Sequence, residues 1–317
     1  MLALVGNIGM WAVIVVLPDM QGEFGVERAD ATFPYIATMI GFAAGNLLLG
    51  RAVDRWGITP VLALAAVALG AGFTGAAFAG SIYVVSAIHV LLGLGASASF
   101  GPLIADISQW FMRRRGIAVA IAASGNYLSG TAWPPFIAWV VADYSWRGAY
   151  IALAVAVVVV VLPGAFLLRR QIDDASTARA ASHAAGMAAR TGLSRRALVL
   201  LLSLAGVGCC VAMSMPQVHI VALCMDRGFG AKAGAEMLSV MLAGGVVSRL
   251  AFGALSDRLG GLKTLLLGSL LQGMALCLFL LDGGLASLYV VSLIFGLSQG
   301  GIVPAYAIIV REYLPPK

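Results

Sequence analysis

The stretch Gly50-Arg51-Ala52-Val53-Asp54-Arg55-Trp56-Gly57 recurs 203 residues later as Gly253-Ala254-Leu255-Ser256-Asp257-Arg258-Leu259-Gly260. Both copies have the form Gly-x-x-x-Asp-Arg-x-Gly, and both stand between two long apolar stretches. Self-similarity at a fixed spacing is the signature of a duplicated structural unit. The motif therefore predicts two copies of one membrane-spanning unit, with a short charged turn between two helices of each copy.

The composition is that of a membrane protein. The chain is 61% hydrophobic and 11% charged, with a mean hydropathy of +0.97, whereas a soluble domain has about 25% charged residues. The 39 glycines fit membrane helices that approach each other closely. The net charge of +6 comes from basic residues dispersed over short segments, so it does not indicate a nucleic-acid partner. The lipid bilayer is the expected surrounding.

Four cysteines lie in apolar stretches: Cys209, Cys210, Cys224 and Cys277. We expect reduced packing residues rather than a disulfide framework or a metal site. No spacing in the sequence resembles a zinc or iron–sulfur site. We therefore expect neither a metal nor a cofactor.

Ten apolar stretches have the length of about 20 residues that a membrane span requires. The first begins at Met1, and a partial first helix is preferred to a signal peptide because no basic segment precedes it. The predicted spans are 1–17, 31–50, 58–79, 82–105, 117–141, 148–168, 197–224, 234–253, 262–281 and 286–310.

The basic residues orient the spans. Four of the 20 Lys and Arg residues fall on the side of the first connection, and the other 16 fall on the opposite side. Because cytoplasmic loops carry the excess of Lys and Arg, the N-terminus is predicted to be cytoplasmic. The expected location is the inner (plasma) membrane, crossed many times. The four residues of the minority side are Arg28, Arg147, Arg227 and Lys232.

Three segments follow from the spans. Residues 1–168 form an N-terminal half with spans 1–6, residues 169–196 form a cytoplasmic linker rich in Ala, Arg and Ser, and residues 197–317 form a C-terminal half with spans 7–10. Gly101-Pro102 in span 4 corresponds to Val303-Pro304 in span 10, so two further spans are expected after Lys317. The alternative is a genuine ten-helix protein.

The duplicated motif and its place resemble the major facilitator superfamily, which implies an all-α membrane fold of two six-helix halves, here with the second half truncated. Duplicated halves are the usual architecture of secondary transporters. Trp110-Phe111-Met112-Arg113-Arg114-Arg115 and Arg249-Leu250-Ala251-Phe252-Gly253 resemble the corresponding stretches of monocarboxylate porters and oxalate–formate exchangers. His89, ahead of Gly93 and Gly95, stands where the superfamily often has an arginine in helix four.

The resemblance implies that the two motifs form a cytoplasmic latch, which holds the outward-facing state and breaks on switching. A carboxylate beside a helix end can accept from backbone N–H groups and pair with an arginine. The alternative is a static helix cap. The latch candidates are Gly50, Asp54, Arg55, Gly57, Arg113, Asp257 and Arg258.

Arg249 is the most informative charged residue within a span, one turn before the predicted cytoplasmic end of helix eight. An ionisable group in the membrane is costly unless it is paired or lines a cavity, and a guanidinium offers a fork of donors to a carboxylate. The alternative is an arginine that snorkels to the interface. Four polar residues near the membrane midplane are further candidates for substrate binding. Each of them could instead form an interhelical hydrogen bond. These residues are Asn7, Asn126, Tyr127 and Gln299.

Two histidines within spans, His89 and His219, are candidates for proton coupling. A histidine titrates near neutral pH and can relay protons. The alternative for each is a hydrogen-bonded packing residue.

The predicted function is secondary active transport of a small organic anion, similar to a monocarboxylate, by alternating access. Proton symport and anion exchange both remain open. The sequence contains no nucleotide-binding loop, and no nucleophile–base or metal constellation that an enzyme would need. The alternatives are a transporter of a neutral solute or drug, and a membrane sensor of the same fold that does not transport.

Overall fold

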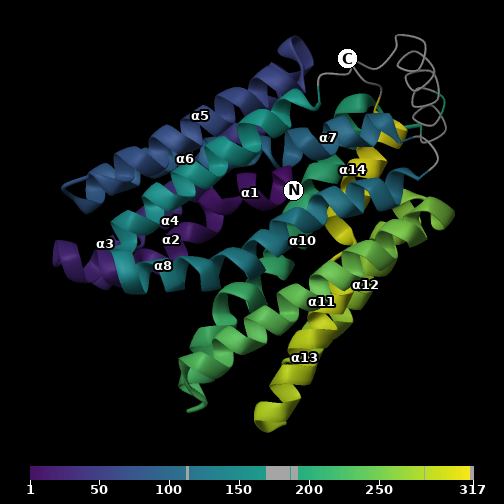
Figure 1. Cartoon of the computed structure of the whole chain (residues 1–317). Coiled ribbons are helices and arrows are strands. Elements are labelled where there is room, and N and C mark those ends of the chain that lie inside the picture. The colour runs from purple at the N-terminus through teal and green to yellow at the C-terminus, as the bar shows by residue number, and fades with distance from the viewer. Residues whose placement is uncertain (112–113, 169–185, 187–191, 282, 315–317) are drawn as a thin grey trace. The chain divides into compact units, whose positions relative to one another are not determined.

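The computed structural model describes residues 1–111, 114–168, 186, 192–281 and 283–314. Within these residues all the regular elements are helices (Figure 1). They form nine segments that are long and apolar enough to cross a membrane, and some of these segments join two consecutive helices. One, α8 (Arg115–Phe166), has 52 residues and holds the predicted spans 5 and 6, because its backbone leaves the helical region only at Ser145 (φ 64°, ψ 171°). This accounts for the difference from the predicted ten.

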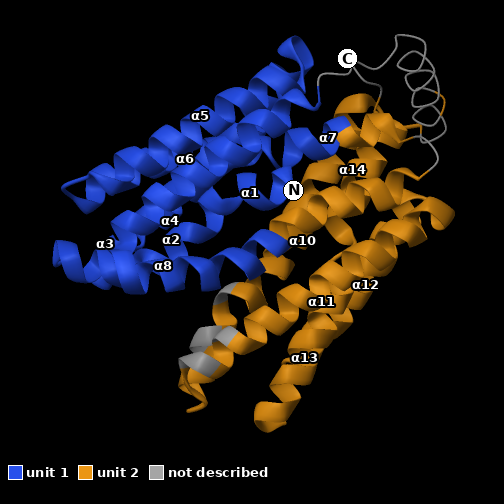
Figure 2. Ribbon diagram, in the orientation of Figure 1, with its two compact units in different colours: residues 1–106, 128–171 blue, residues 107–127, 172–317 orange. Residues whose placement is uncertain are grey.

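The chain divides into two compact units, residues 1–106 with 128–171 and residues 107–127 with 172–317 (Figure 2). The first unit therefore holds the later part of α8, and the second holds its first turns. The remaining helices of unit 1 are α1 (Leu2–Gly6), α2 (Ile8–Phe24), α3 (Arg28–Ala31), α4 (Phe33–Trp56), α5 (Ile58–Ala77) and α6 (Ile82–Ala98). Helix α7 (Gly101–Trp110) begins in unit 1 and ends in unit 2.

The described residues of unit 2 form five further helices: α10 (Arg195–Asp226), α11 (Gly230–Leu259), α12 (Gly261–Leu278), α13 (Gly284–Gln299) and α14 (Ile302–Tyr313). The predicted linker 169–196 lies for the most part outside the described residues. Three predicted spans consist of two helices each, with breaks at Asn7, at 99–100 and at 300–301. Pro102 and Pro304 each follow a break by a few residues, as expected for a residue that lacks a backbone donor.

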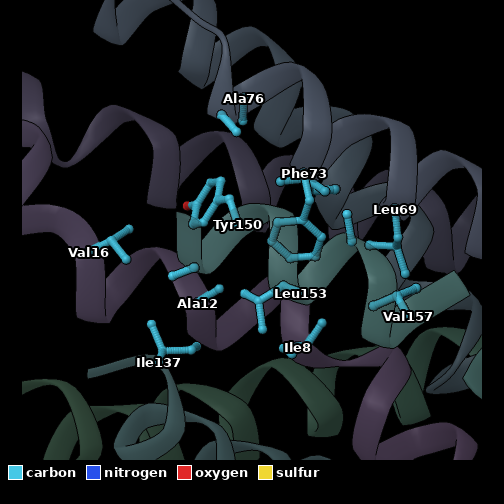
Figure 3. Packing of buried hydrophobic residues seen from close by; sticks show 14 of the residues in the cluster. Ile8, Ala12, Val16, Leu69, Phe73, Ala76, Ile137, Tyr150, Leu153 and Val157 are labelled. Atoms are coloured by element: carbon cyan, nitrogen blue, oxygen red, sulfur yellow. The ribbon is translucent and has the colours of Figure 1, made fainter. Parts of the chain in front are cut away.

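The core of unit 1 is formed by α2, α5 and the later part of α8. Phe73 meets Tyr150 edge to face, with ring centroids 5.2 Å apart, and Trp146 packs against the same tyrosine. Such dense van der Waals packing is what holds helices together in lipid, where the hydrophobic effect gives no preference for contact between them. Figure 3 shows part of this cluster, with labels on Ile8, Ala12, Val16, Leu69, Phe73, Ala76, Ile137, Tyr150, Leu153 and Val157.

The second glycine of each motif ends a helix in the same conformation. Gly57 has φ 82° and ψ 168°, and Gly260 has φ 80° and ψ 165°, a region open essentially to glycine alone. The prediction of Asp54 and Asp257 in short turns was wrong in detail, because α4 and α11 continue until these glycines. Both aspartates lie in the last turn of a helix.

The duplication extends to a close helix crossing. A Cβ atom added to Gly93 in α6 would lie 2.0 Å from the carbonyl oxygen of Thr38 in α4. At the same spacing of 203 residues, a Cβ on Gly296 in α13 would lie 2.1 Å from the carbonyl oxygen of Met241 in α11. Each unit thus contains such a helix pair at corresponding positions, with backbones that meet at a glycine, as small residues permit in membranes.

Gly296→Val is expected to prevent accumulation of the protein, because its side chain would overlap a backbone carbonyl and overpacking costs about 1–3 kcal/mol or more. The measurement is the amount of folded protein in detergent extracts by fluorescence-detected chromatography. Gly273→Val in α12 is the control, since a Cβ there meets no atom within 4 Å. Equal abundance of the two variants would contradict the close crossing.

Candidate functional site

Arg249 is a buried cation in the interior of unit 2. Its side chain is 2% exposed, and it lies well inside α11, which continues for ten residues to Leu259. The expected position one turn before the helix end was wrong, because the helix extends past the apolar stretch through the whole motif. This burial also contradicts the snorkelling alternative, in which the charged head would reach the interface.

The guanidinium of Arg249 is held by two groups of α8. One Nη donates to the carbonyl oxygen of Ala123, and the guanidinium carbon lies 3.5 Å from the centroid of the Tyr127 ring. Both partners belong to the segment 107–127 of the same unit. A cation over an aromatic face is attracted by the ring quadrupole, and more strongly when both are desolvated.

These contacts leave the charge of Arg249 uncompensated. No carboxylate of the described residues lies within ion-pair distance of it, and its Nε has no hydrogen-bond acceptor among them. A buried charge without a counter-ion is strongly unfavourable. The arrangement is therefore suited to receive an anion.

Tyr127 continues the polar cluster toward α10. Its hydroxyl donates to Sδ of Met213 at 3.5 Å, and its ring lies against the backbone of Gly245, where an added Cβ would be 2.6 Å from the ring. The neighbouring Asn126 is also buried, with 7% exposed. The sequence identified Tyr127 and Asn126 but not Met213, which is indistinguishable in sequence from a packing residue.

Two glutamines of the same unit are hydrogen-bonded to each other. Nε2 of Gln217 in α10 donates to Oε1 of Gln299, the last residue of α13, at 3.1 Å. Gln299 is 1% exposed, and its own Nε2 has no acceptor among the described residues. The missed residue Gln217 had a signal, since it is a polar side chain within an apolar stretch.

Asn7, the fifth substrate-binding candidate, lies in unit 1 at the break between α1 and α2. Its Nδ2 donates to the carbonyl oxygens of Ala3 at 2.6 Å and Ser99 at 3.3 Å. The Ser99 carbonyl lies at the break between α6 and α7, and the Ala3 carbonyl also accepts from the backbone N–H of Asn7 at 3.3 Å. The contacts favour the interhelical alternative for Asn7.

The two histidines lie in different surroundings. His89 in α6 is fully buried, with Nδ1 2.8 Å from the carbonyl oxygen of Val85 and Nε2 3.0 Å from the hydroxyl of Tyr150. Nδ1 must then carry the proton, and Nε2 accepts from the tyrosine, which favours a packing role. His219 in α10 has an exposed side chain. Proton coupling by either residue stays a prediction.

The second motif copy contacts the start of α8. Oδ1 of Asp257 accepts from the backbone N–H of Gly116 at 2.6 Å, and Oδ2 accepts from that of Ile117 at 3.2 Å. The carboxylate thus satisfies two of the first-turn donors and faces the positive end of the helix dipole. The two backbones meet here, since a Cβ on Gly116 would lie 2.2 Å from the carbonyl oxygen of Gly253.

The first motif copy is more open. Asp54 is exposed and has no hydrogen-bond partner among the described residues, and Arg55 lies 5.9 Å from the Trp56 ring centroid. Arg113, the predicted partner of Asp54, lies outside the described residues. Gly50 lies within α4 and Arg258 in the last turn of α11, and no contact among the described residues assigns either of them a role. The latch prediction for these residues remains a prediction.

Comparison with known proteins supports the resemblance. The sequence model of the family described as Major Facilitator Superfamily matches residues 1–317. Monocarboxylate transporter 13 of Rattus norvegicus is 28% identical over 293 residues, which cover 90% of this chain and 67% of that protein. Monocarboxylate transporter 11 of Homo sapiens is 28% identical over 249 residues, covering 76% and 51%. The chain spans about half to two thirds of the length of these curated relatives.

The fold is also that of a solved transporter. The structure of the proton:xylose symporter XylE bound to 6-bromo-6-deoxy-D-glucose matches with a TM-score of 0.73 and 14% sequence identity. The match covers 99% of this chain and 81% of that protein. At this identity the likeness concerns the fold alone.

Proposed function

Because the chain belongs to the major facilitator superfamily, we propose that it is a secondary active transporter that moves a small organic anion, similar to a monocarboxylate, across the inner (plasma) membrane by alternating access. The observation that carries the proposal is Arg249, a buried guanidinium without a carboxylate partner among the described residues. The named relatives that transport monocarboxylates agree with an anionic substrate.

The geometry of Arg249 supports recognition of a carboxylate. One edge of the guanidinium is taken by the Ala123 carbonyl and one face by Tyr127, so the Nε edge is the part left for a ligand. A carboxylate can accept two parallel N–H bonds from such a fork, which a neutral solute cannot do with equal strength. A neutral substrate would also leave the buried charge uncompensated, so the neutral-solute alternative is the weaker one.

Asp257 supplies a candidate for the moving contact. It joins the end of α11 to the first turn of α8 through two backbone N–H groups, at the end of the helices that the basic residues predict to be cytoplasmic. In the proposed cycle this contact holds one state and breaks on switching. Substrate bound at Arg249 touches the same two helices, which gives a route from binding to the latch.

Transport and substrate class are tested together by a competition panel. The protein is reconstituted into proteoliposomes, and uptake of labelled pyruvate is measured against carboxylates, sugars and amphipathic drugs. Competition confined to carboxylates supports the proposal. Competition by drugs or sugars favours the neutral-solute alternative, and binding without uptake favours the sensor. An imposed pH gradient or a preloaded anion distinguishes symport from exchange.

A cytoplasmic N-terminus predicts that Gly80, in the connection between α5 and α6, lies on the outer side of the membrane. It also predicts that Ser182 lies on the cytoplasmic side. In a variant without native cysteines, Gly80→Cys is expected to react with an impermeant maleimide in intact cells, because its position is exposed and on the side poor in basic residues. Ser182→Cys is expected to react only after permeabilisation. Labelling of Ser182→Cys in intact cells would overturn the orientation.

A further inference from the structure

Several side chains of unit 2 lie along a series of contacts and neighbouring helix positions that begins at Arg249. The guanidinium lies on Tyr127, and the Tyr127 hydroxyl reaches Met213. One turn along α10 from Met213 is Gln217, since residues four apart share a helix face, and Gln217 donates to Gln299. The series therefore joins three helices, α8, α10 and α13, to the arginine of α11.

A glycine brings the last member of the series back to the first. A Cβ on Gly300, the residue after Gln299, would lie 2.7 Å from the backbone nitrogen of Arg249 and 2.4 Å from the carbonyl oxygen of Gly245. The C-terminal end of α13 thus lies directly against the turn of α11 that carries Arg249. Gln299 and Arg249 are placed on adjoining stretches of two touching backbones.

Two buried donors of this series are unused. Nε of Arg249 and Nε2 of Gln299 have no acceptor among the described residues, although their side chains are 2% and 1% exposed. A buried donor without an acceptor costs about 1–3 kcal/mol. Each such cost needs an explanation, and a ligand that supplies the missing acceptors is one that would account for both donors together.

The two donors differ in charge. Arg249 is a cation, and among the described residues of unit 2 it is the one Lys or Arg whose side chain is buried. The Gln299 amide, in contrast, is neutral. The carbonyl end of that amide is already occupied by Gln217, which fixes the amine end as the free group. One cation and one neutral donor match a ligand with one negative charge and one neutral acceptor.

Resting on the proposed function, we propose that Gln299, oriented by Gln217, is the specificity-determining residue of the site. It donates to a neutral acceptor of the substrate, while Arg249 binds the carboxylate. The substrate class is then a monoanion that carries a second, uncharged hydrogen-bond acceptor. Plain alkanoates lack the acceptor, and dianions bring a second charge for which the cluster offers no second cation.

The test uses three anions of similar size in proteoliposomes: propionate without a second acceptor, pyruvate with a neutral one, and malonate with a second charge. For the unchanged protein, unlabelled pyruvate is expected to compete with the uptake of labelled pyruvate about tenfold better than propionate does. This factor corresponds to the loss of one buried hydrogen bond. In Gln299→Met that preference is expected to fall to about twofold or less, because the donor is gone while propionate binding is kept.

Two further variants keep the test decisive. Gln299→Asn retains an amide but shortens the side chain by one methylene, so it is also expected to lose the preference for pyruvate. It serves as the test variant if Gln299→Met does not accumulate. Gln272→Met is the matched control, since Gln272 is a buried glutamine of α12 that donates to the Cys209 carbonyl at 3.3 Å. It is expected to keep the preference for pyruvate.

The outcomes separate this inference from the proposed function. Equal competition by propionate and pyruvate in the unchanged protein, or better competition by malonate, overturns the inference and leaves anion transport standing. An unchanged preference in the Gln299 variants, or the same loss in Gln272→Met, also overturns it. Failure of all three anions to compete overturns both the inference and the proposed function.

Discussion

Arg249→Lys is expected to weaken carboxylate transport by about 10- to 100-fold in apparent affinity, although the positive charge is kept. An ammonium cannot offer two parallel donors, and it cannot reach the Ala123 carbonyl and stack on Tyr127 at the same time. The measurement is the concentration dependence of pyruvate uptake at matched protein amounts in proteoliposomes.

A purely structural role for Arg249 predicts a different result. In that case Arg249→Lys reduces the amount of folded protein, and the molecules that fold retain the normal affinity. Lys263→Arg, at an exposed position near the start of α12, is a control for changes of cationic side chain elsewhere. Unchanged affinity in Arg249→Lys at normal abundance would remove Arg249 from the substrate site.

Asp257→Asn is expected to change the transport rate per molecule by about 5- to 30-fold, which corresponds to about 1–2 kcal/mol for a charge at a helix N-terminus in a partly buried setting. Asparagine keeps the size and one acceptor oxygen, but it removes the charge and turns a donor toward the N–H groups of Gly116 and Ile117. The state held by this contact becomes less populated.

Stability and turnover of the Asp257→Asn variant distinguish a static helix cap from a latch. It predicts a lower melting temperature and unchanged turnover of the folded molecules, whereas a latch predicts altered turnover at near-normal abundance. Asp226→Asn, at the exposed C-terminal end of α10, is the matched control. Normal turnover in Asp257→Asn, with stability lowered, would assign Asp257 to the static cap.

The membrane fold followed from the sequence because its signals are local. Apolar stretches of span length predicted the helices, and the repeated motif predicted the duplication, which the paired conformations of Gly57 and Gly260 confirm. The resemblance to the major facilitator superfamily was confirmed by the family match over residues 1–317. Helix ends were predicted less well, because a charged motif such as that around Asp257 continues a helix as readily as it forms a turn.

The site was predicted only in part, because its decisive features are non-local. Arg249, Tyr127 and Gln299 stand out as polar residues in apolar stretches. Their pairing does not, since Ala123 contributes a backbone carbonyl and Met213 a thioether that no sequence pattern marks. The absence of a carboxylate beside Arg249 among the described residues is likewise a property of the packed helices.

The proposed function rests on Arg249 as a buried guanidinium that selects a small organic anion for transport. The most direct measurement compares propionate with propionamide, its neutral counterpart of nearly equal size, as competitors of labelled pyruvate uptake in proteoliposomes. We expect propionate to compete at least about 100-fold better than propionamide, since only the anion compensates the charge of Arg249. Equal competition by the amide, or pyruvate binding without any uptake, would contradict it.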